Sequence, residues 1–395
     1  MKRKMLFLIV LSLLMFVPLL AQAADEPGAV YAMTNANDGN EIVVYHRAAD
    51  GLLTQAGTYS THGDGETTEP DDALGSEGPI LALSPDHRFL FAVNAGSDTI
   101  AAFQIDQDNL TFLEVVDSHG DLPVSLTVHN NLLYVLNARG GGNISGFTVD
   151  NNGHLTYLEG STRPLNADTP DNQPFFLNSP AQVGFNPVGD KLVVTVKGAL
   201  VHQPKIHVFT VDGNGLPSAQ PVTTDYPDVS VSFGFAFDDL NNLIVAEPFG
   251  AGFPPPGPIG AAASYRIAAD GSLTSISDTV SNDQVATCWI AITTNTRFVY
   301  STNNGGDGEE EGGTISSYKV GSDGSLSLIN GIAGRTGDAP VDLAITPSNQ
   351  YLYNVNAGSG TVSMFKIDQK NGNLISLGEI AGLPDDGSAV GIAAR

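Results

Sequence analysis

The strongest constraint on the fold is a short strand-and-turn unit that the sequence repeats seven times. In each copy an aromatic residue opens a short alternating strand, and in six copies an Asn-Gly or Asp-Gly turn follows. Such dipeptides between alternating runs are the strongest short-range signal for a β-hairpin. The second copy departs from the pattern and has Asp108-Asn109 instead. The aromatic residues, which recur about every 50 positions, are Tyr45, Phe103, Phe147, Phe209, Tyr265, Tyr318 and Phe365.

A second strand precedes each aromatic residue and usually ends in Asn, and a third, mostly apolar strand such as Val124 to Val128 precedes most of these. Four strands in a repeat of about 50 residues are typical of a propeller blade. The sequence therefore predicts an all-β, seven-bladed β-propeller. Its expected second strands are Val30 to Asn35, Phe89 to Asn94, Leu132 to Asn137, Leu192 to Lys197, Leu243 to Glu247, Phe298 to Asn303 and Tyr351 to Asn356.

The first repeat begins directly with a second strand, so it lacks an inner strand of its own. The segment from Ala389 to Ala394 is similar to the inner strand from Pro340 to Ile345. We therefore expect the C-terminal strand to complete the first blade and close the ring, which removes exposed sheet edges.

The N-terminus is typical of a secretory signal. Lys2, Arg3 and Lys4 precede an apolar run, and Ala21-Gln22-Ala23 forms a cleavage site. We expect residues 1–23 to be removed and 24–395 to form one propeller domain that is periplasmic or secreted. The alternative is an uncleaved membrane anchor, for which the apolar run is short. The single cysteine, Cys288, excludes a disulfide within the chain.

Charge narrows the choice of partners. The chain has 43 acidic and 17 basic residues, a net charge of −26, which argues against nucleic acids and anionic membrane surfaces. We expect a monomer without a cofactor, which binds a small molecule or a macromolecule at one face. Clustered acids are ligands that Ca²⁺ accepts, so a calcium site stays open, although no EF-hand loop is present. These acids are Asp64, Glu66, Glu69, Asp71, Asp72, Asp307, Glu309, Glu310 and Glu311.

The long links between predicted strands all fall on one face of the ring, which is where propeller function is usually found. The link after the fifth second strand contains Phe253-Pro254-Pro255-Pro256-Gly257-Pro258, a stiff segment that is a candidate lid. The long links span 64–77, 166–178, 197–205, 248–261 and 303–313.

The blade phrases Leu81 to Asp86, Leu133 to Asn137 and Tyr353 to Gly358 resemble the lactonase family of seven-bladed β-propellers. That family includes bacterial 6-phosphogluconolactonases and fungal carboxymuconate-lactonising enzymes, so the resemblance implies a lactone as substrate. It also implies a functional Glu at the end of the fifth second strand, which Glu247 matches. The link from Lys197 to Ile206 resembles the basic loop of the family.

The chain also departs from the family pattern. Gln182 lies near the point where the family places a His on the fourth inner strand. The stretch from Ser232 to Phe235 replaces an Arg and a His at the start of the fifth inner strand. The family's imidazole and guanidinium groups are therefore missing from their expected positions.

Glu247 and Lys197 are the predicted catalytic residues. Both are expected where the other five repeats have Asn, at the mouth of a central channel. A carboxylate there suits a general base for water, and an ammonium suits the binding of a developing oxyanion or an anionic substrate. The alternative is a salt bridge between blades with no catalytic role.

The predicted substrate-binding residues lie around the same channel. Asn137, Asn303 and Asn356 end second strands, with Asn35 and Asn94 at the matching positions; alternatively these residues adopt the left-handed conformation and start turns. The inner strands contribute Gln182, Asp342 and Trp289.

Two functions remain open at this stage. The first is a lactonase-like hydrolase or isomerase outside the cytoplasm, acting on a small oxygenated molecule. The second is a non-catalytic propeller that binds a protein, a glycan or a cation through its acidic links. The resemblance to the lactonase family favours the first, and the missing His and Arg favour the second.

Overall fold

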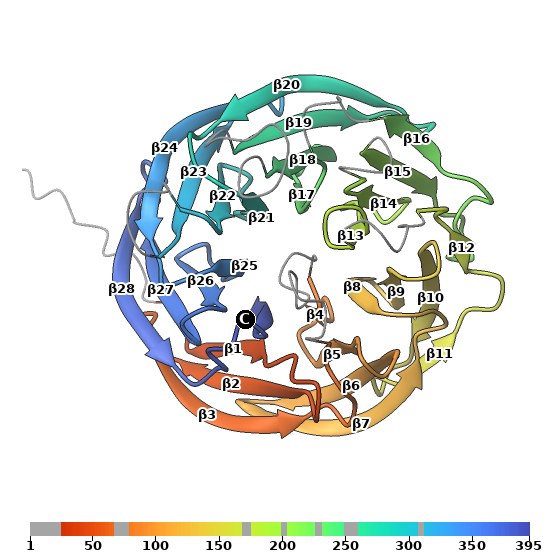
Figure 1. Cartoon of the computed structure of the whole chain (residues 1–395), viewed down its shortest axis with the longest axis horizontal. Helices are drawn as coiled ribbons and strands as arrows, with labels where there is room; N and C mark the ends of the chain where they lie inside the picture. The colour runs from red at the N-terminus through yellow and green to blue at the C-terminus, as the bar shows by residue number, and fades with distance from the viewer. Residues whose placement is uncertain are drawn as a thin grey trace, which may run out of the picture.

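The computed structural model describes residues 25–66, 79–167, 175–198, 204–225, 231–248, 260–306 and 312–395. These residues form 29 β-strands arranged in seven antiparallel sheets. Figure 1 shows the sheets as blades around a common axis, with the strands of each blade following one another from the centre to the rim. The predicted seven-bladed β-propeller is therefore confirmed. No helix long and apolar enough to cross a membrane occurs among the described residues.

The first four blades follow one another along the chain. Blade 1 consists of β29 (Val390–Ala394), β1 (Gly28–Met33), β2 (Glu41–Arg47) and β3 (Leu53–Ser60), from the axis outward. Blade 2 consists of β4 (Leu81–Leu83), β5 (Phe89–Asn94), β6 (Thr99–Asp106) and β7 (Asn109–Asp117). Blade 3 consists of β8 (Pro123–His129), β9 (Leu132–Asn137), β10 (Asn143–Val149), β11 (Leu155–Tyr157) and β12 (Arg163–Pro164). Blade 4 consists of β13 (Pro180–Phe185), β14 (Lys191–Val196), β15 (Lys205–Thr210) and β16 (Val222–Asp225).

The remaining three blades have the same order of strands. Blade 5 consists of β17 (Phe235–Phe237), β18 (Asn242–Glu247), β19 (Ala261–Ile267) and β20 (Leu273–Ser281). Blade 6 consists of β21 (Thr287–Ile292), β22 (Phe298–Asn303), β23 (Thr314–Val320) and β24 (Leu326–Arg335). Blade 7 consists of β25 (Pro340–Ile345), β26 (Tyr351–Asn356), β27 (Thr361–Ile367) and β28 (Leu374–Ala381).

The C-terminal strand closes the ring, as the sequence predicts. β29 pairs with β1 from Val30↔Ala394 to Met33↔Val390, and the register shifts at Gly391. Gly391 has a φ of 81°, and a Cβ there would lie 2.4 Å from Cγ1 of Ile80, so the bulge requires glycine. The bulge directs the backbone N–H of Ile392 away from β1 and toward blade 7.

A buried arginine strengthens this closure. Arg47, only 3% exposed, lies 3.0 Å from the Asp25 carboxylate through Nη1. Its Nη2 donates to the backbone oxygens of Glu26 and Arg395, at 2.8 and 3.2 Å. Arg47 thereby connects the segment before β1 with the residue after β29. A buried guanidinium that is satisfied in this way stabilises the junction, whereas its removal would leave buried acceptors without donors.

Inner strands of neighbouring blades are linked by one repeated side-chain position. In three blades, the residue two positions after the proline that begins the inner strand accepts a hydrogen bond from a backbone N–H of the next blade. Ser125 accepts from Val183 N at 3.1 Å, Gln182 from Phe235 N at 2.9 Å, and Asp342 from Ile392 N at 3.3 Å. The three donors occupy equivalent positions in the pairing of inner and second strands. These links hold successive blades in a fixed rotation about the axis.

The outer parts of the blades are linked in a second way, which explains the Gly turns of the sequence. The hydroxyl groups of Tyr134, Tyr300 and Tyr353 donate to the backbone oxygens of the turn glycines Gly215, Gly372 and Gly51 in the next blade, at 2.7 to 2.9 Å. The predicted hairpin turns therefore do more than reverse the chain, because they also contact the preceding blade.

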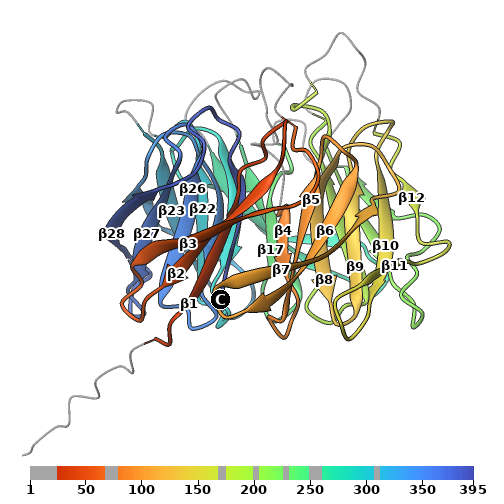
Figure 2. The same ribbon diagram turned by 90° about the horizontal axis from the view of Figure 1, so that it is seen from below.

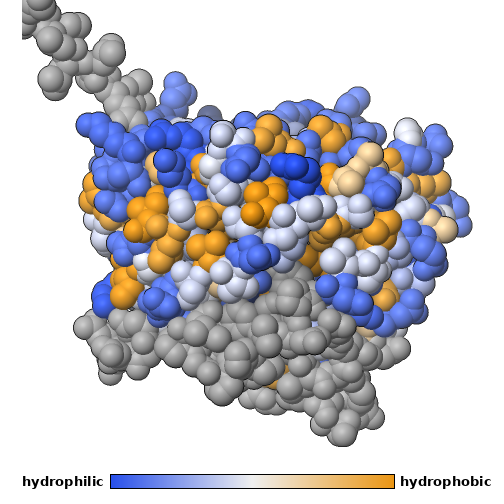
Figure 3. Space-filling model, turned by 90° about the horizontal axis from the view of Figure 1, so that it is seen from above, coloured by the Kyte–Doolittle hydropathy of each residue, from blue (hydrophilic) through white to orange (hydrophobic). Residues whose placement is uncertain are grey.

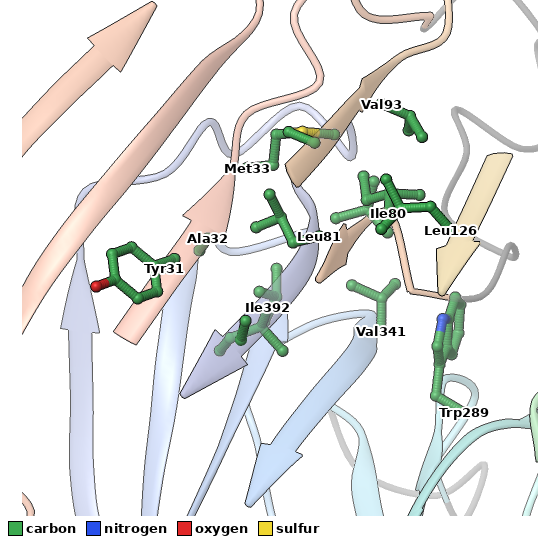
Figure 4. Close-up of a cluster of buried hydrophobic side chains, with 14 of the residues drawn as sticks. Tyr31, Ala32, Met33, Ile80, Leu81, Val93, Leu126, Trp289, Val341 and Ile392 are labelled. Carbon is green, nitrogen blue, oxygen red and sulfur yellow. The ribbon is translucent and has the colours of Figure 1, made fainter. Parts of the chain in front are cut away.

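Apolar side chains meet at the axis. Figure 4 shows Leu81, Leu126, Val341 and Ile392, which come from four different inner strands, directed toward one another. All four are at most 4% exposed. The outermost strands instead consist mostly of exposed and half-buried residues. Figure 3 shows hydrophilic and hydrophobic residues interspersed on the outer wall of the ring. The hydrophobic core therefore extends around the ring and through its centre.

Deletion of residues 389–395 should destabilise the protein by more than about 5 kcal/mol, which is comparable with the whole stability of a typical domain. The deletion exposes the edge of β1 and removes the N–H group that Asp342 binds. Urea unfolding followed by circular dichroism measures the effect. The control is Arg395→Ala, which keeps β29 and should cost no more than about 2 kcal/mol. Equal stability of the deletion and the control would contradict the closure described here.

Candidate functional site

The ends of the second strands lie at the end of the ring that is uppermost in Figure 2, called the upper end below. In four blades an Asn closes the second strand opposite the first residue of the third strand, and its Nδ2 donates to that residue's side chain at 2.8 to 3.2 Å. All four Asn residues are fully buried. The pairs are Asn94 with Thr99, Asn137 with Asn143, Asn303 with Thr314, and Asn356 with Thr361.

These contacts show what the Asn side chains do in the protein. They tie the second strand to the third at the upper end, which neither of the sequence-based interpretations anticipates. Among the five Asn residues, Asn35 has a positive φ, 52°, as expected for a turn starter, while the four that close strands do not. Binding of a substrate by Asn137, Asn303 or Asn356 stays a prediction, and it would compete with these structural hydrogen bonds.

The strand register corrects the predicted position of Lys197. Leu192 lies opposite the aromatic Phe209, as Leu90 lies opposite Phe103. The equivalent of Asn94 in blade 4 is therefore Val196, and Lys197 lies one residue further on. The expectation that Lys197 occupies the Asn position was wrong because β14 begins at Lys191, one residue earlier than predicted.

The same shift applies to Asn35, because Val30 lies opposite Tyr45 and Thr34 is then the equivalent of Asn94. In blade 5, by contrast, Leu243 lies opposite Tyr265, so Glu247 does occupy the Asn position as predicted. Lys197 instead stands where blades 2, 3 and 7 have Ala95, Ala138 and Ala357.

This one-residue offset determines where the Lys197 side chain points. Side chains alternate between the two faces of a strand. Val193 and Val245 pack in one cluster between blades 4 and 5, so Lys197, four residues after Val193, also faces blade 5. Glu247, two residues after Val245, faces blade 4. The two predicted catalytic residues therefore lie on facing surfaces of neighbouring blades, at the upper end of both.

Lys197 lies over an aromatic pair. Its Nζ is 5.1 Å from the centroid of the Phe233 ring, within the range of a cation–π interaction. Phe233 contacts Trp289 edge to face, with ring centroids 5.6 Å apart. The Oγ1 of Thr195 donates to the backbone oxygen of Phe233 at 2.7 Å and ties the backbone of Phe233 to blade 4. Trp289 also belongs to the apolar cluster at the axis, as Figure 4 shows.

Glu247 breaks the pattern of the strand ends. It is 1% exposed and lies opposite Ala261, which has no polar side chain to pair with it. Burial raises the pKa of the Tyr318 hydroxyl in blade 6, and the negative charge of Glu247 raises it further.

The other predicted site residues have structural contacts. Gln182 holds both backbone groups of Phe235, with its Nε2 donating to the oxygen at 3.0 Å. Asp342 is 6% exposed and accepts hydrogen bonds from Leu343 N and Ile392 N. Trp289 occupies the equivalent position in blade 6. The sequence offers no sign of this shared role, because the bulges that align the three residues are visible only in the register.

The structure limits which side chains the start of the inner strand of blade 5 can carry. The N–H of Gly234 donates to the backbone oxygen of Cys288 at 3.1 Å, and a Cβ at this position would lie 2.7 Å from that oxygen. A long side chain at residue 234 is thus excluded. His207 does not replace the missing imidazole, since burial and Lys205 lower its pKa to about 4 and its partner Val194 faces blade 3.

Most of the acidic links that the sequence singles out lie outside the described residues. These are Glu69, Asp71, Asp72 and the segment from Asp307 to Glu311. The candidate lid from Phe253 to Pro258 also lies outside the described residues. Within the described part of the chain, no group of three or more His, Cys, Asp or Glu side chains is placed to hold a metal ion.

The fold and the repeat agree with a known family. Residues 26–169, 65–230 and 258–386 match the family model described as "Lactonase, 7-bladed beta-propeller". The matches cover well over half of the chain, so the protein belongs to this family of lactonase propellers. No curated protein matches the chain by sequence.

Several solved structures share the whole fold. A Bacteroides fragilis protein, provisionally described as a 6-phosphogluconolactonase, is 18% identical with a TM-score of 0.68, covering 95% of this chain and 99% of its own. The periplasmic gluconolactonase of Pseudomonas aeruginosa is 16% identical with a TM-score of 0.65, covering 91% and 98%. A Lactobacillus plantarum protein is 19% identical with a TM-score of 0.69, covering 93% and 99%. At these identities the likeness shows the fold alone.

Asp342 should make stability depend on pH. Burial raises its pKa from 3.8 to about 7, so between about pH 4 and 7 the folded chain holds a proton that the unfolded chain has lost. The free energy of unfolding therefore falls as the pH rises through this window, by a few kcal/mol. Asp342→Asn, which cannot ionise, should flatten this decline when thermal unfolding is followed from pH 4 to 8.

The matched control is Asp278→Asn, which changes an exposed aspartate on β20 and should leave the pH dependence as in the wild type. An unchanged slope in Asp342→Asn would show that Asp342 is ionised throughout and that the ring closure tolerates its charge.

Proposed function

We propose that the protein hydrolyses a small lactone at the upper end of the interface between blades 4 and 5. The observation that carries this proposal is the placement of Lys197 and Glu247 on facing surfaces of blades 4 and 5, two of the three blades where the repeated Asn pair is absent. In the third, blade 1, Thr34 takes the Asn position and its Oγ1 accepts from the N–H of Glu41 at 3.0 Å, so the second and third strands are still joined. At the corresponding positions of blades 4 and 5, Val196 lies opposite Lys205 and Glu247 lies opposite Ala261. Breaks in an otherwise consistent pattern are where functional residues are expected. Membership of the lactonase family supports the choice of substrate.

In this proposal Glu247 is the general base. Its carboxylate takes a proton from a water molecule as the water oxygen attacks the lactone carbonyl, and the ring oxygen leaves as the C–O bond breaks. The ring oxygen then receives that proton from Glu247, which restores the carboxylate, and the product is a hydroxy acid. General base catalysis of this kind contributes about 10²- to 10⁴-fold.

Lys197 stabilises the oxyanion that develops on the carbonyl oxygen. A preorganised cation in a buried site is effective because it needs little reorganisation as the charge develops. Phe233 and Trp289 beneath the lysine hold the ammonium group in place.

We further propose that the protein works as a monomer outside the cytoplasm, without a cofactor. The basic and apolar N-terminal segment with its Ala-Gln-Ala site supports the location. The Pseudomonas aeruginosa protein, which shares the fold, is described as periplasmic.

Mutation of both residues tests the proposal. Glu247→Gln should lower kcat for lactone hydrolysis by about 10²- to 10⁴-fold, and Lys197→Met by about 10²- to 10³-fold, measured by acid release at constant pH. The matched control is Lys191→Met, which removes a buried lysine that pairs with Asp190 at the other end of the same strand. It should retain the wild-type rate.

The outcomes separate the two candidate functions. Full activity of Glu247→Gln would place the reaction elsewhere. A wild-type protein that binds ligands but hydrolyses no sugar or aromatic lactone would support the non-catalytic binding propeller instead.

A further inference from the structure

A second cation lies at the same end of the ring. Arg139 follows the second strand of blade 3, and its side chain is 39% exposed. Its guanidinium carbon lies 5.9 Å from the centroid of the Phe175 ring, and its Nη1 lies 3.6 Å from Oε2 of Glu66. A guanidinium that lies against an aromatic face and is oriented by a carboxylate has a restricted direction, while its exposed part remains accessible to a ligand.

Glu66 is itself held in place from blade 1. The side-chain amide of Asn35 binds both backbone groups of Glu66: its Nδ2 donates to the oxygen at 2.9 Å, and its Oδ1 accepts from the N–H at 3.1 Å. The N–H of Gly65 donates to the oxygen of Ala36. The carboxylate of Glu66 therefore extends from blade 1 to blade 3 across the upper end of the ring. This contact is also the role of Asn35, which sequence reasoning did not identify.

A short turn connects Arg139 with the proposed catalytic site. The backbone oxygen of Phe175 accepts hydrogen bonds from the N–H groups of Asn178 and Ser179, both at 2.9 Å. The oxygen of Ser179 in turn accepts from the N–H of Lys197 at 3.1 Å. Phe175, which contacts Arg139, is thus connected to Lys197 through backbone hydrogen bonds of the turn that ends at Ser179. Arg139 and Lys197 come from adjacent blades and face the same end of the ring.

We propose that Arg139 determines substrate specificity by binding a carboxylate group of the lactone. This inference rests on the proposed function, since it assigns a substrate class to the same site. The planar guanidinium matches a carboxylate through two parallel hydrogen bonds.

The charges around Arg139 favour a monoanion over a phosphate ester. A phosphate monoester has a charge of about −1.5 to −2 at pH 7, and Glu66 already offsets part of the single positive charge of Arg139. The chain as a whole has a net charge of −26, so a dianion would also meet general repulsion. A carboxylate-bearing sugar lactone, such as the lactone of an aldaric acid, fits the site better than a phosphorylated one.

Steady-state kinetics with two lactones of the same ring size tests this inference. One is a neutral aldonolactone, and the other an aldarolactone with a free carboxylate. Arg139→Gln should raise KM for the aldarolactone at least tenfold, with kcat changed less than threefold, and leave both constants for the neutral lactone unchanged. Arg139→Lys keeps the positive charge but loses the planar guanidinium group. Its KM for the aldarolactone should therefore lie between the values of Arg139→Gln and the wild type.

The matched control is Arg266→Gln, which removes an exposed arginine at the opposite end of β19 and should change neither lactone's KM. Equal effects of Arg139→Gln on both lactones, or none on either, would overturn the inference while the proposed function stands. If the wild type hydrolyses neither lactone, the proposed function fails. Calorimetric binding of the intact aldarolactone then tests the assignment of Arg139. Tenfold weaker binding by Arg139→Gln than by the wild type supports the assignment. Equal affinities of the two proteins, or no binding by the wild type, overturn it.

Discussion

The structure depends on the lateral attachment of one inner strand to the next around a closed ring. A blade contains few strands and cannot bury both of its faces alone, so each blade packs against two neighbours. Ser125, Gln182 and Asp342 fix the rotation between successive inner strands by accepting an N–H from the next blade. Asp342 makes this contact where the chain closes, with the bulge of β29 at Gly391 providing the donor.

The candidate site is explained by a local departure from this regularity. In blades 2, 3, 6 and 7 a buried Asn at the upper end of the second strand donates a side-chain hydrogen bond to the first residue of the third strand. Blade 1 has Thr34 at this position, bonded to the N–H of Glu41. Blades 4 and 5 have neither contact, and there the chain places a lysine and a glutamate on facing surfaces. The aromatic pair of Phe233 and Trp289 supports the lysine and joins the site to the apolar axis. The scaffold that positions these groups is rigid because the adjacent strands are fully paired.

The periodic features of the fold could be predicted from the sequence, because hairpin turns and alternating strands are local signals. The closing strand was also predictable, since 389–394 is similar to 340–345. The roles of individual site residues were less accessible. The shift of Lys197 by one position follows from the start of β14 at Lys191, which no local signal marks. The shared role of Gln182 and Asp342 depends on bulges, and the contact of Glu66 with Arg139 joins blades that are far apart in the chain.

The central claim is that the interface of blades 4 and 5 binds the substrate. Hydrogen–deuterium exchange of the wild-type protein tests this claim most directly. Exchange is compared with and without the hydroxy acid formed from a lactone that the protein hydrolyses. A ligand at the proposed site should slow exchange in 178–198 and 231–247, where backbone and side chains would become ordered around it. Protection confined to blades 1, 2, 6 and 7, with 178–198 and 231–247 unchanged, would contradict the account.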